Sequence, residues 1–194
     1  AMDCLNGAYD QNLDEGNFAS NKCTISAGDY YITRVELDDN VDLIFDTTSG
    51  PVNMAVESDD ITISNNANIT VIGNNPVKLY LSLSPSKELE IKDVEINRNT
   101  NDNSTLFQVT VSGGKKISFK NAKFCGYVYA PDATVEVDTY TEIYGALVGK
   151  LFKIKNAQNI HFDEALKNID IGVGEATTIM YLYITRNDLG VSIS

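Results

Sequence analysis

The sequence predicts an all-β protein, a right-handed parallel β-helix (β-solenoid) with a short C-terminal capping helix and a packed C-terminal strand. The main observation is an internal repeat: residues 124–163 match themselves after a shift of nineteen residues. Each copy holds a small apolar strand, a turn and a second strand with alternate apolar residues, which is typical of a solenoid coil of about twenty residues. Gly, Thr, Val and Tyr dominate without a 3.6-residue stripe, which excludes a helical fold. The shift aligns Gly126 with Gly145, Val128 with Leu147, Ala130 with Gly149 and Val135 with Ile154.

Short strands that end in turn residues are predicted along most of the chain. Residues 1–29 are expected to form loop and one short helix. Further strands alternate apolar and polar residues and end in Asn, Asp, Ser or Gly, as tight turns require. They are expected at 30–37, 41–45, 52–56, 61–63, 69–71, 77–83, 89–91, 94–96, 107–111 and 117–119. Asparagines between strands suit left-handed backbone angles, and the candidates are Asn65, Asn66, Asn68, Asn74 and Asn75.

The C-terminal end of the solenoid is predicted to be sealed. Asp163 is expected to cap a short helix over 164–168. The segment 178–185, TIMYLYIT, is apolar on both faces and therefore needs cover on both sides. We expect it to pack on the outer face of the coils, which is made unusually apolar by Tyr127, Tyr129, Ala146 and Val148.

Three regions follow from these patterns: an acidic segment over 1–40, the β-solenoid over 41–166, and a linker with C-terminal strand(s) over 167–194. Ala1 and Met2 indicate residues left from cloning. Residues 1–60 hold 13 acidic and 2 basic side chains of a chain with net charge −12. This charge disfavours nucleic acid, which needs clustered Lys and Arg. We expect no cofactor or metal, because Asp38, Asp39, Asp42 and Asp46 follow neither an EF-hand nor an RTX repeat. Calcium binding by the acidic N-terminal third stays an open alternative.

The three cysteines predict one disulfide and one buried thiol. Cys4 and Cys23 flank a polar segment, and a bridge between them would close a loop that adds about 3 kcal/mol of stability. Such a bridge suits an extracellular protein, whereas the alternative is three free thiols in a reducing cytosol. Cys125 lies inside a strand and is expected to be a small buried residue. His161 is the one histidine of the chain, so we expect no zinc site.

The solenoid class raises the possibility of polysaccharide cleavage, which needs two carboxylates about 5 to 10 Å apart. The candidate carboxylates alternate with inward valines and lie beside Lys153 and Lys155 of the next coil, so stacked ion pairs explain them. His161 and Asp163 lack a Ser or Cys nucleophile motif, and we expect a structural hydrogen bond at the end cap instead. The chain is therefore predicted not to be an enzyme and to have no catalytic residues. The carboxylates weighed are Asp132, Glu136, Asp138 and Glu142.

Two further surface features bear on partners. A basic patch is expected to meet acidic surfaces of a neighbouring subunit, and it consists of Lys115, Lys116, Lys120 and Lys123. Asn68 and Asn103 begin N-glycosylation sequons in Asn-rich turns. Sequons suit an exterior protein, although a chain rich in Asn and Thr contains some by chance.

Four motifs carry a resemblance to a known family: GYVYAPDATVEV (126–137), YGALVGKLFKIKNA (144–157), IHFDEAL (160–166) and ATTIMYLYITRNDLGVSIS (176–194). They resemble the secreted region of archaeal type IV pilin-like surface proteins, best represented among halophiles, and the resemblance covers residues 50–194. It implies a β-solenoid that ends in a His-aromatic-Asp-Glu-Ala-Leu motif, a terminal strand, and an apolar pilin-type N-terminal helix that is missing here.

We therefore expect a non-enzymatic extracellular protein of the cell surface, with a structural or adhesive role, as a pilin-like subunit or surface module. The expected partners are other surface or pilus subunits, a second copy of the chain and surface glycans, with membrane contact through the missing helix alone. The alternative, from another class, is a carbohydrate-binding or carbohydrate-cleaving solenoid, and the ten tyrosines leave binding open.

Overall fold

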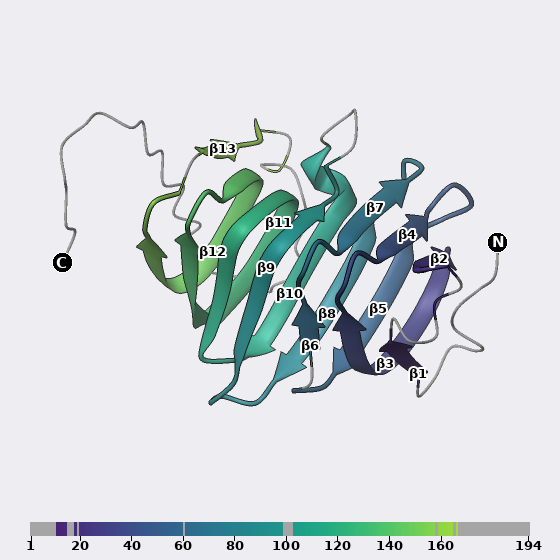
Figure 1. Cartoon of the computed structure of the whole chain (residues 1–194), viewed down its shortest axis with the longest axis horizontal. Helices are drawn as coiled ribbons and strands as arrows, with labels where there is room; N and C mark the ends of the chain where they lie inside the picture. Colours follow the sequence, from purple (N-terminus) through teal and green to yellow (C-terminus); the bar gives the residue numbers. More distant parts are fainter. Residues whose placement is uncertain are drawn as a thin grey trace, which may run out of the picture.

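Parallel pairing governs the whole strand arrangement. The computed structural model describes residues 11–14, 18, 20–59, 61–98, 103–157, 159–164 and 166. Among these residues every strand pairs with its neighbours in parallel, and the chain advances along the long axis of the molecule from its purple to its green end (Figure 1). The prediction of an all-β protein with parallel strands is confirmed.

The described strands form one sheet of thirteen members, and a short 3-10 turn, η2 (Ser104–Leu106), precedes β10. The strands predicted between residues 30 and 154 are present, although several of them merge into longer strands that turn corners without a break. The bounds are β1 Gln11–Asp14, β2 Lys22–Ser26, β3 Gly28–Leu37, β4 Asp42–Asp46, β5 Val52–Glu57, β6 Ile61–Ile63, β7 Asn68–Ile72, β8 Val77–Leu83, β9 Glu88–Ile96, β10 Phe107–Gly113, β11 Lys116–Asp138, β12 Glu142–Ile154 and β13 Asn159–Phe162.

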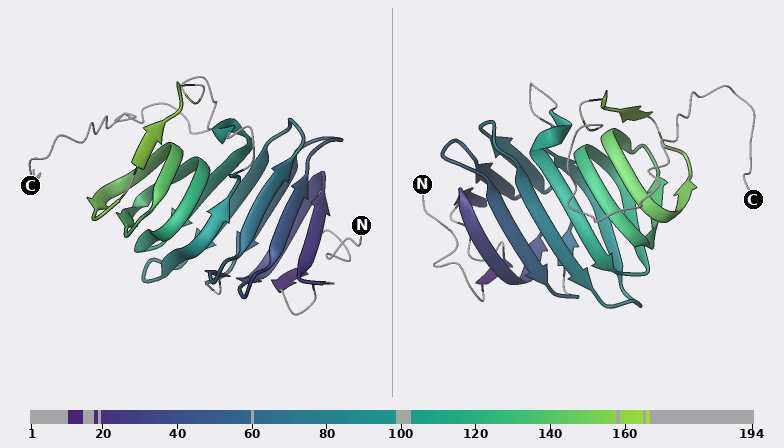
Figure 2. Two further views of the ribbon diagram at one scale, coloured as in Figure 1. Left: turned by 45° about the horizontal axis from the view of Figure 1, so that its top comes forward. Right: turned by 180° about the vertical axis from the view of Figure 1, so that it is seen from behind.

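The register of the pairs arranges the strands in three faces, and each coil contributes one strand segment to each face. Face 1 contains β5, β8 and β10 with the start of β3 and the middle parts of β11 and β12. Face 2 contains β1, the end of β3, β6, the start of β9, the two ends of β11 and the end of β12. Face 3 contains β2, β4, β7, the end of β9, part of β11, the start of β12 and β13. The three views agree that the strands lie side by side along the long axis (Figure 2).

The faces enclose the core because the long strands pair on more than one side. β3, β6, β9, β11, β10, β8 and β5 pair successively and return to β3, so the sheet closes on itself. Inside, apolar residues at one register position stack from coil to coil, each about 4.8 Å from the next. On face 1 this column is Tyr30, Met54, Leu79, Val109, Val128 and Leu147; on face 3 it is Cys23, Leu43, Ile69, Ile96, Phe124, Ile143 and Ile160.

Aromatic rings fill the middle of this core. The ring centroids of Phe107 and Phe124 lie 6.1 Å apart, and those of Phe119 and Phe124 lie 5.4 Å apart, both edge to face. The remaining apolar cavity measures about 40 Å³. A space of that size with an apolar lining offers a ligand no polar contact, so the interior is packed core and binding must occur outside it.

The corner between faces 2 and 3 is a row of left-handed residues. Asn65 and Asn66 have φ of 49° and 65°, which confirms their prediction. Asn68, by contrast, lies in β7, and the left-handed angle near Asn74 is taken by Gly73. The left-handed residues along this corner are Ser20, Asn21, Asp39, Asn40, Asn65, Asn66, Asp93, Asn121, Thr139, Tyr140 and Asn156.

The N-terminal part differs from expectation. Residues 1–29 were expected to be loop and helix, but 11–14 and 22–26 are strands of the same sheet, so the stack begins before residue 41. Leu13, Cys23 and Ile25 are buried in the core. Each of these strands contributes one or two apolar residues, too few to produce a recognisable alternation in the sequence.

The nineteen-residue repeat is right on face 1 and wrong on face 2. Val128 pairs with Leu147 as predicted, but Val135 pairs with Phe152, and Ile154 pairs with Val137. The register shifts because three residues separate Ala130 from Thr134, whereas a single residue separates Gly149 from Leu151. A register shift of two residues leaves each side chain on the same side of the sheet, so the alternation correctly predicts Val135 and Ile154 to point inward although their partners differ.

The C-terminal end agrees with expectation in part. Leu166 packs on Tyr127 and Tyr129, next to Ala146 and Val148, which confirms the predicted apolar outer face. The Leu166 N–H donates to the Asp163 carbonyl, and Glu164 and Leu166 have 3-10 geometry where a capping helix was predicted. The rest of that helix and the predicted strand 178–185 lie outside the described residues. Within the described part of the chain, no helix has the length and apolar character to span a membrane.

Glycine is required where face 3 turns into face 1. A Cβ at Gly145, whose φ is 140°, would lie 1.8 Å from the Gly126 carbonyl oxygen of the preceding coil. We predict that Gly145→Ala lowers the free energy of unfolding by about 2–4 kcal/mol, through main-chain displacement and strain. Gly50→Ala is the control, because it shares the strain of a positive φ (158°) while its Cβ would meet an ordinary contact at 3.6 Å. Urea denaturation measures both, and equal stability of the two variants would contradict the close approach.

Candidate functional site

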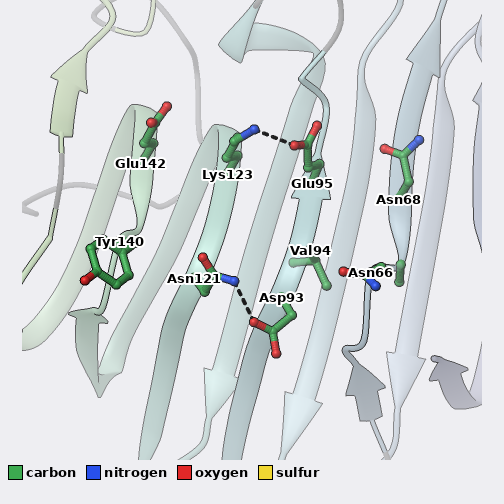
Figure 3. Close-up of a pocket in the computed structure, with 10 residues that line it drawn as sticks. Asn66, Asn68, Asp93, Val94, Glu95, Asn121, Lys123, Tyr140 and Glu142 are labelled. Atoms are coloured by element: carbon green, nitrogen blue, oxygen red, sulfur yellow. Dashed lines mark hydrogen bonds and ion pairs between the residues drawn. The ribbon is translucent and has the colours of Figure 1, made fainter. Parts of the chain in front are cut away.

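A polar groove lies along the outside of face 3, next to the left-handed corner. It has a volume of about 540 Å³. Figure 3 shows that its walls come from successive coils, with the side chains of β7, β9, β11 and β12 directed outward. The lining residues are Asn66, Ala67, Asn68, Asp93, Val94, Glu95, Asn121, Lys123, Tyr140 and Glu142.

Two columns of polar side chains form this groove, because residues at the same register position recur on each coil. The strand column is set by main-chain pairing and consists of Lys22, Asp42, Asn68, Glu95, Lys123, Glu142 and Asn159. The corner column follows the left-handed residues and consists of Asn40, Asn66, Asp93, Asn121 and Tyr140.

Hydrogen bonds connect neighbours in the corner column. Asn66 Nδ2 donates to Asn40 Oδ1 at 3.2 Å, and Asn121 Nδ2 donates to Asp93 Oδ1 at 2.7 Å (Figure 3). The main-chain N–H of Asn121 donates to the Thr139 carbonyl, which fixes the next coil. Tyr140 ends the groove, and its side chain is 65% exposed.

Charge alternates along the strand column where Glu95, Lys123 and Glu142 follow one another. Lys123 Nζ donates to Glu95 Oε1 at 2.6 Å (Figure 3). This hydrogen bond, together with the negative charges of Glu95 and Glu142, raises the pKa of Lys123 above its usual value. Asn68 Nδ2 donates to Asp42 Oδ1 at 3.2 Å at the other end of the groove. The groove therefore combines amide, carboxylate and ammonium groups with one exposed aromatic ring.

The four carboxylates considered for catalysis do not converge on one point. The Glu136 side chain is 10% exposed and accepts from Lys155 Nζ at 3.3 Å, which confirms its predicted pairing with the next coil. Asp138 accepts from the main-chain N–H of Thr139 at 2.7 Å in the corner turn. Glu142 lines the groove on face 3, and Asp132 lies at the opposite corner, between faces 1 and 2.

The basic patch is paired within the chain. Lys115 and Lys116 contact the Glu88 carboxylate at 2.9 and 2.8 Å, and Lys120 contacts Glu90. With Lys123 on Glu95, every lysine of the patch meets a glutamate of the preceding coil. These lysines therefore contribute to the contact between coils, and their contact with a neighbouring subunit stays a prediction.

The His161 motif is part of an aromatic stack. The His161 ring lies 4.6 Å from the Tyr144 ring at an interplanar angle of 18°, and the Arg98 guanidinium lies 3.9 Å from the centre of the same Tyr144 ring. Asp163 Oδ2 accepts from Ser104 Oγ at 2.6 Å. Asp163 thus makes the expected structural hydrogen bond at the end of the stack, and it holds the segment that precedes β10.

Two important residues were missed at the level of sequence. Asn97 is fully buried, and its Nδ2 donates to the carbonyls of Cys125 at 3.0 Å and Asn103 at 3.1 Å. The sequence marked Asn97 only by its position, as the first residue of the Asn-rich segment that interrupts the series of predicted strands. Tyr140 stands nineteen residues after Asn121, so comparing the repeat copies would have marked an aromatic residue in a corner otherwise rich in asparagine.

The cysteines and sequons complete the predicted sites. Cys23 is disulfide-bonded, and Cys125 is a buried thiol outside any disulfide. Cys4 lies outside the described residues, so the Cys4–Cys23 pairing stays a prediction. Asn103 is exposed and caps η2, whereas Asn68 is half-buried in β7 and does not lie in a turn. Among the described residues, no group of three or more His, Cys, Asp or Glu side chains could hold a metal ion.

These features define a class: an all-β domain of parallel strands whose polar outer columns enclose a surface groove. The chain belongs to the family described as "Domain of unknown function (DUF7305)", whose model matches residues 3–169. The matched range includes every described strand, so the family pattern covers the whole stack. No curated protein and no solved structure matches the chain.

The pairing of Glu88 predicts a pH-dependent stability. Hydrogen bonds from Lys116 and Lys115, with their charges, lower the pKa of Glu88 to about 2. The folded pKa lies below the unfolded value of about 4.5, so the carboxylate stabilises the fold above pH 4.5 and this contribution is lost between pH 4.5 and 2. We predict that NMR titration gives a Glu88 pKa near 2, and that Lys116→Met raises it while Lys150→Met, at an exposed lysine elsewhere, does not. A Glu88 pKa near 4.5 in the parent would contradict the pairing.

Proposed function

We propose that this chain is the ectodomain of an archaeal type IV pilin-like surface protein, a right-handed parallel β-solenoid with a non-enzymatic structural or adhesive role outside the cell. The observation that carries the proposal is the use of the outward charged side chains. Glu88, Glu90, Glu95 and Glu136 each contact a lysine of the next coil. Such pairing serves rigidity along an axis, which a surface rod or filament subunit needs.

The solenoid assignment has two supports. The strands of one face recur along the chain and pair in parallel with the next of that face. Parallel strands joined by crossovers within a sheet are right-handed in about 98% of cases, which favours a right-handed coil. The family resemblance, which covers residues 50–194, points to the same fold.

Two observations support the exterior location and the structural role. The disulfide at Cys23 suits an oxidising compartment. The carboxylates weighed for catalysis are distributed over two corners and two faces, where Glu136 and Asp138 take part in ion pairs and turns. A retaining or inverting glycosidase instead needs two carboxylates directed at one bond.

The surface role can be tested on intact cells. Antibodies against this domain should label the outside of unpermeabilised source cells in immunogold microscopy, and the protein should appear in the filament fraction sheared from those cells. A cytoplasmic protein that is processed in parallel is the control for lysis. Label confined to permeabilised cells would overturn the proposal.

Carbohydrate binding is the second candidate function, and the exposed Tyr140 favours it. A sugar ring can stack on the Tyr140 side chain while Asn121, Asn66 and Glu142 offer hydrogen bonds to its hydroxyl groups. The lining residues Asp93, Glu95 and Glu142 against Lys123 leave a net negative charge. The groove therefore favours neutral over acidic oligosaccharides.

We predict that a neutral oligosaccharide from a screened panel binds the parent, and that Tyr140→Ala weakens it at least about tenfold, or about 1.4 kcal/mol. Tyr80→Ala is the matched control, since Tyr80 is 47% exposed on face 1, away from the groove. Isothermal titration calorimetry measures the affinities. Equal loss in both variants would remove the groove as the binding site, and turnover abolished by Asp132→Ala, Glu136→Ala or Asp163→Ala would instead support a cleaving enzyme.

A further inference from the structure

Among the described strands, the last coil leaves an apolar edge without a neighbouring strand on face 2. Here β12 continues through Leu151, Phe152 and Ile154, which are 53%, 36% and 39% exposed. One coil earlier, Val135 and Val137, the partners of Phe152 and Ile154, are fully buried. Phe152 and Ile154 therefore continue the inward column of face 2, but no described strand covers them.

The main chain of this edge is also open. β13 pairs with β12 over Glu142–Gly145, on face 3, and no described strand pairs with Leu151–Ile154 beyond β11. The Lys155 N–H donates to the Val137 carbonyl. Alternate residues of a parallel strand direct their main-chain groups to opposite neighbours, so the N–H groups of Phe152 and Ile154 face the open side.

A second copy of the chain fits this edge poorly. Lys150, Lys153 and Lys155 surround it, and two such edges side by side would bring like charges together. At the opposite end the described part of the stack begins with β1, whose Leu13 is 2% exposed and therefore presents no matching apolar side chain. The occupant should therefore be uncharged, apolar and available within the chain.

We propose that the segment Thr178–Thr185, which lies outside the described residues, adds to the Leu151–Ile154 edge of its own chain as the closing strand of face 2. TIMYLYIT contains no charged residue and is apolar at consecutive positions. One row of its side chains continues the inward column over Phe152 and Ile154. The other row covers Leu151 and the aliphatic part of Lys153.

The connection is long enough for this closure. Eleven residues separate Leu166, the last described residue, from Thr178, and an extended chain reaches about 3.3 Å per residue, or about 36 Å. A tether of this length keeps the segment at a local concentration of order millimolar, which favours the chain's own segment over one from another copy. This location differs from the outer face of Tyr127 and Tyr129, which is already buried and contacts Leu166.

Amide hydrogen exchange by NMR on the full chain tests the proposal. We expect exchange at Phe152 and Ile154 to be slowed by on the order of tenfold or more relative to an unstructured peptide, as for Lys153, and we expect the amides of 178–185 to be slowed likewise. Leu182→Asp and Tyr181→Asp, one in each side-chain row, should restore fast exchange at Phe152 and Ile154. Asn187→Asp, with the same charge beyond the segment, should not.

Three outcomes would overturn the proposal. The first is exchange at Phe152 and Ile154 as fast as in an unstructured peptide while Lys153 stays protected. The second is protection that disappears on dilution, which would assign the strand to another copy. The third is slow exchange at Phe152 and Ile154 that persists in both Asp variants. In that experiment, unchanged exchange rates of the β5 amides show that the stack is intact. Because the parent measurements alone can refute it, the proposal does not depend on the variants folding.

Discussion

Parallel main-chain pairing between successive coils is the constraint on which the rest of this molecule depends. It places residues of equal register about 4.8 Å apart on every face. Inward positions must then be apolar and of matched volume, because each inward side chain packs against those of the preceding and the following coil. Outward positions must alternate charge or share hydrogen bonds, because like charges at this spacing repel. The core columns, the Lys–Glu pairs and the Asn–Asp corner are thus three results of one spacing.

The same constraint limits where the chain can change direction. At the corner of faces 2 and 3 a left-handed residue turns each coil, and its side chain is directed outward beside the same residue of the next coil. Asparagine suits this position twice, through its tolerance of positive φ and through an amide that bonds to its neighbour. Tyr140 satisfies neither preference, yet it stands at φ 53° with its ring exposed. A residue kept against local preference, beside a polar groove, is the strongest local reason to seek a ligand there.

Period-two alternation predicted the strands between residues 30 and 154, because the alternation survives any even slip in register. For that reason Val135 was placed on the right side but opposite the wrong partner. It failed for β1 and β2, whose few apolar residues carry no visible period, and for Asn97, whose partners are main-chain carbonyls distant in sequence. The groove was not predicted, because it arises from two columns that single strands do not reveal.

A stack built by repetition has no intrinsic reason to stop, so its ends need separate solutions. At the C-terminal end of the described chain, face 3 is continued by β13 and the outer side of face 1 contacts Leu166, whereas the last described strand of face 2 ends with Phe152 and Ile154. Lysines around this edge discourage pairing with other edges, but they leave the apolar surface itself exposed to water. The exposure of Phe152 and Ile154 beside these lysines is consistent with an edge that pairs with an uncharged strand and repels positively charged ones. The sequence after Leu166 contains one uncharged apolar segment, TIMYLYIT, as the proposed closing strand requires.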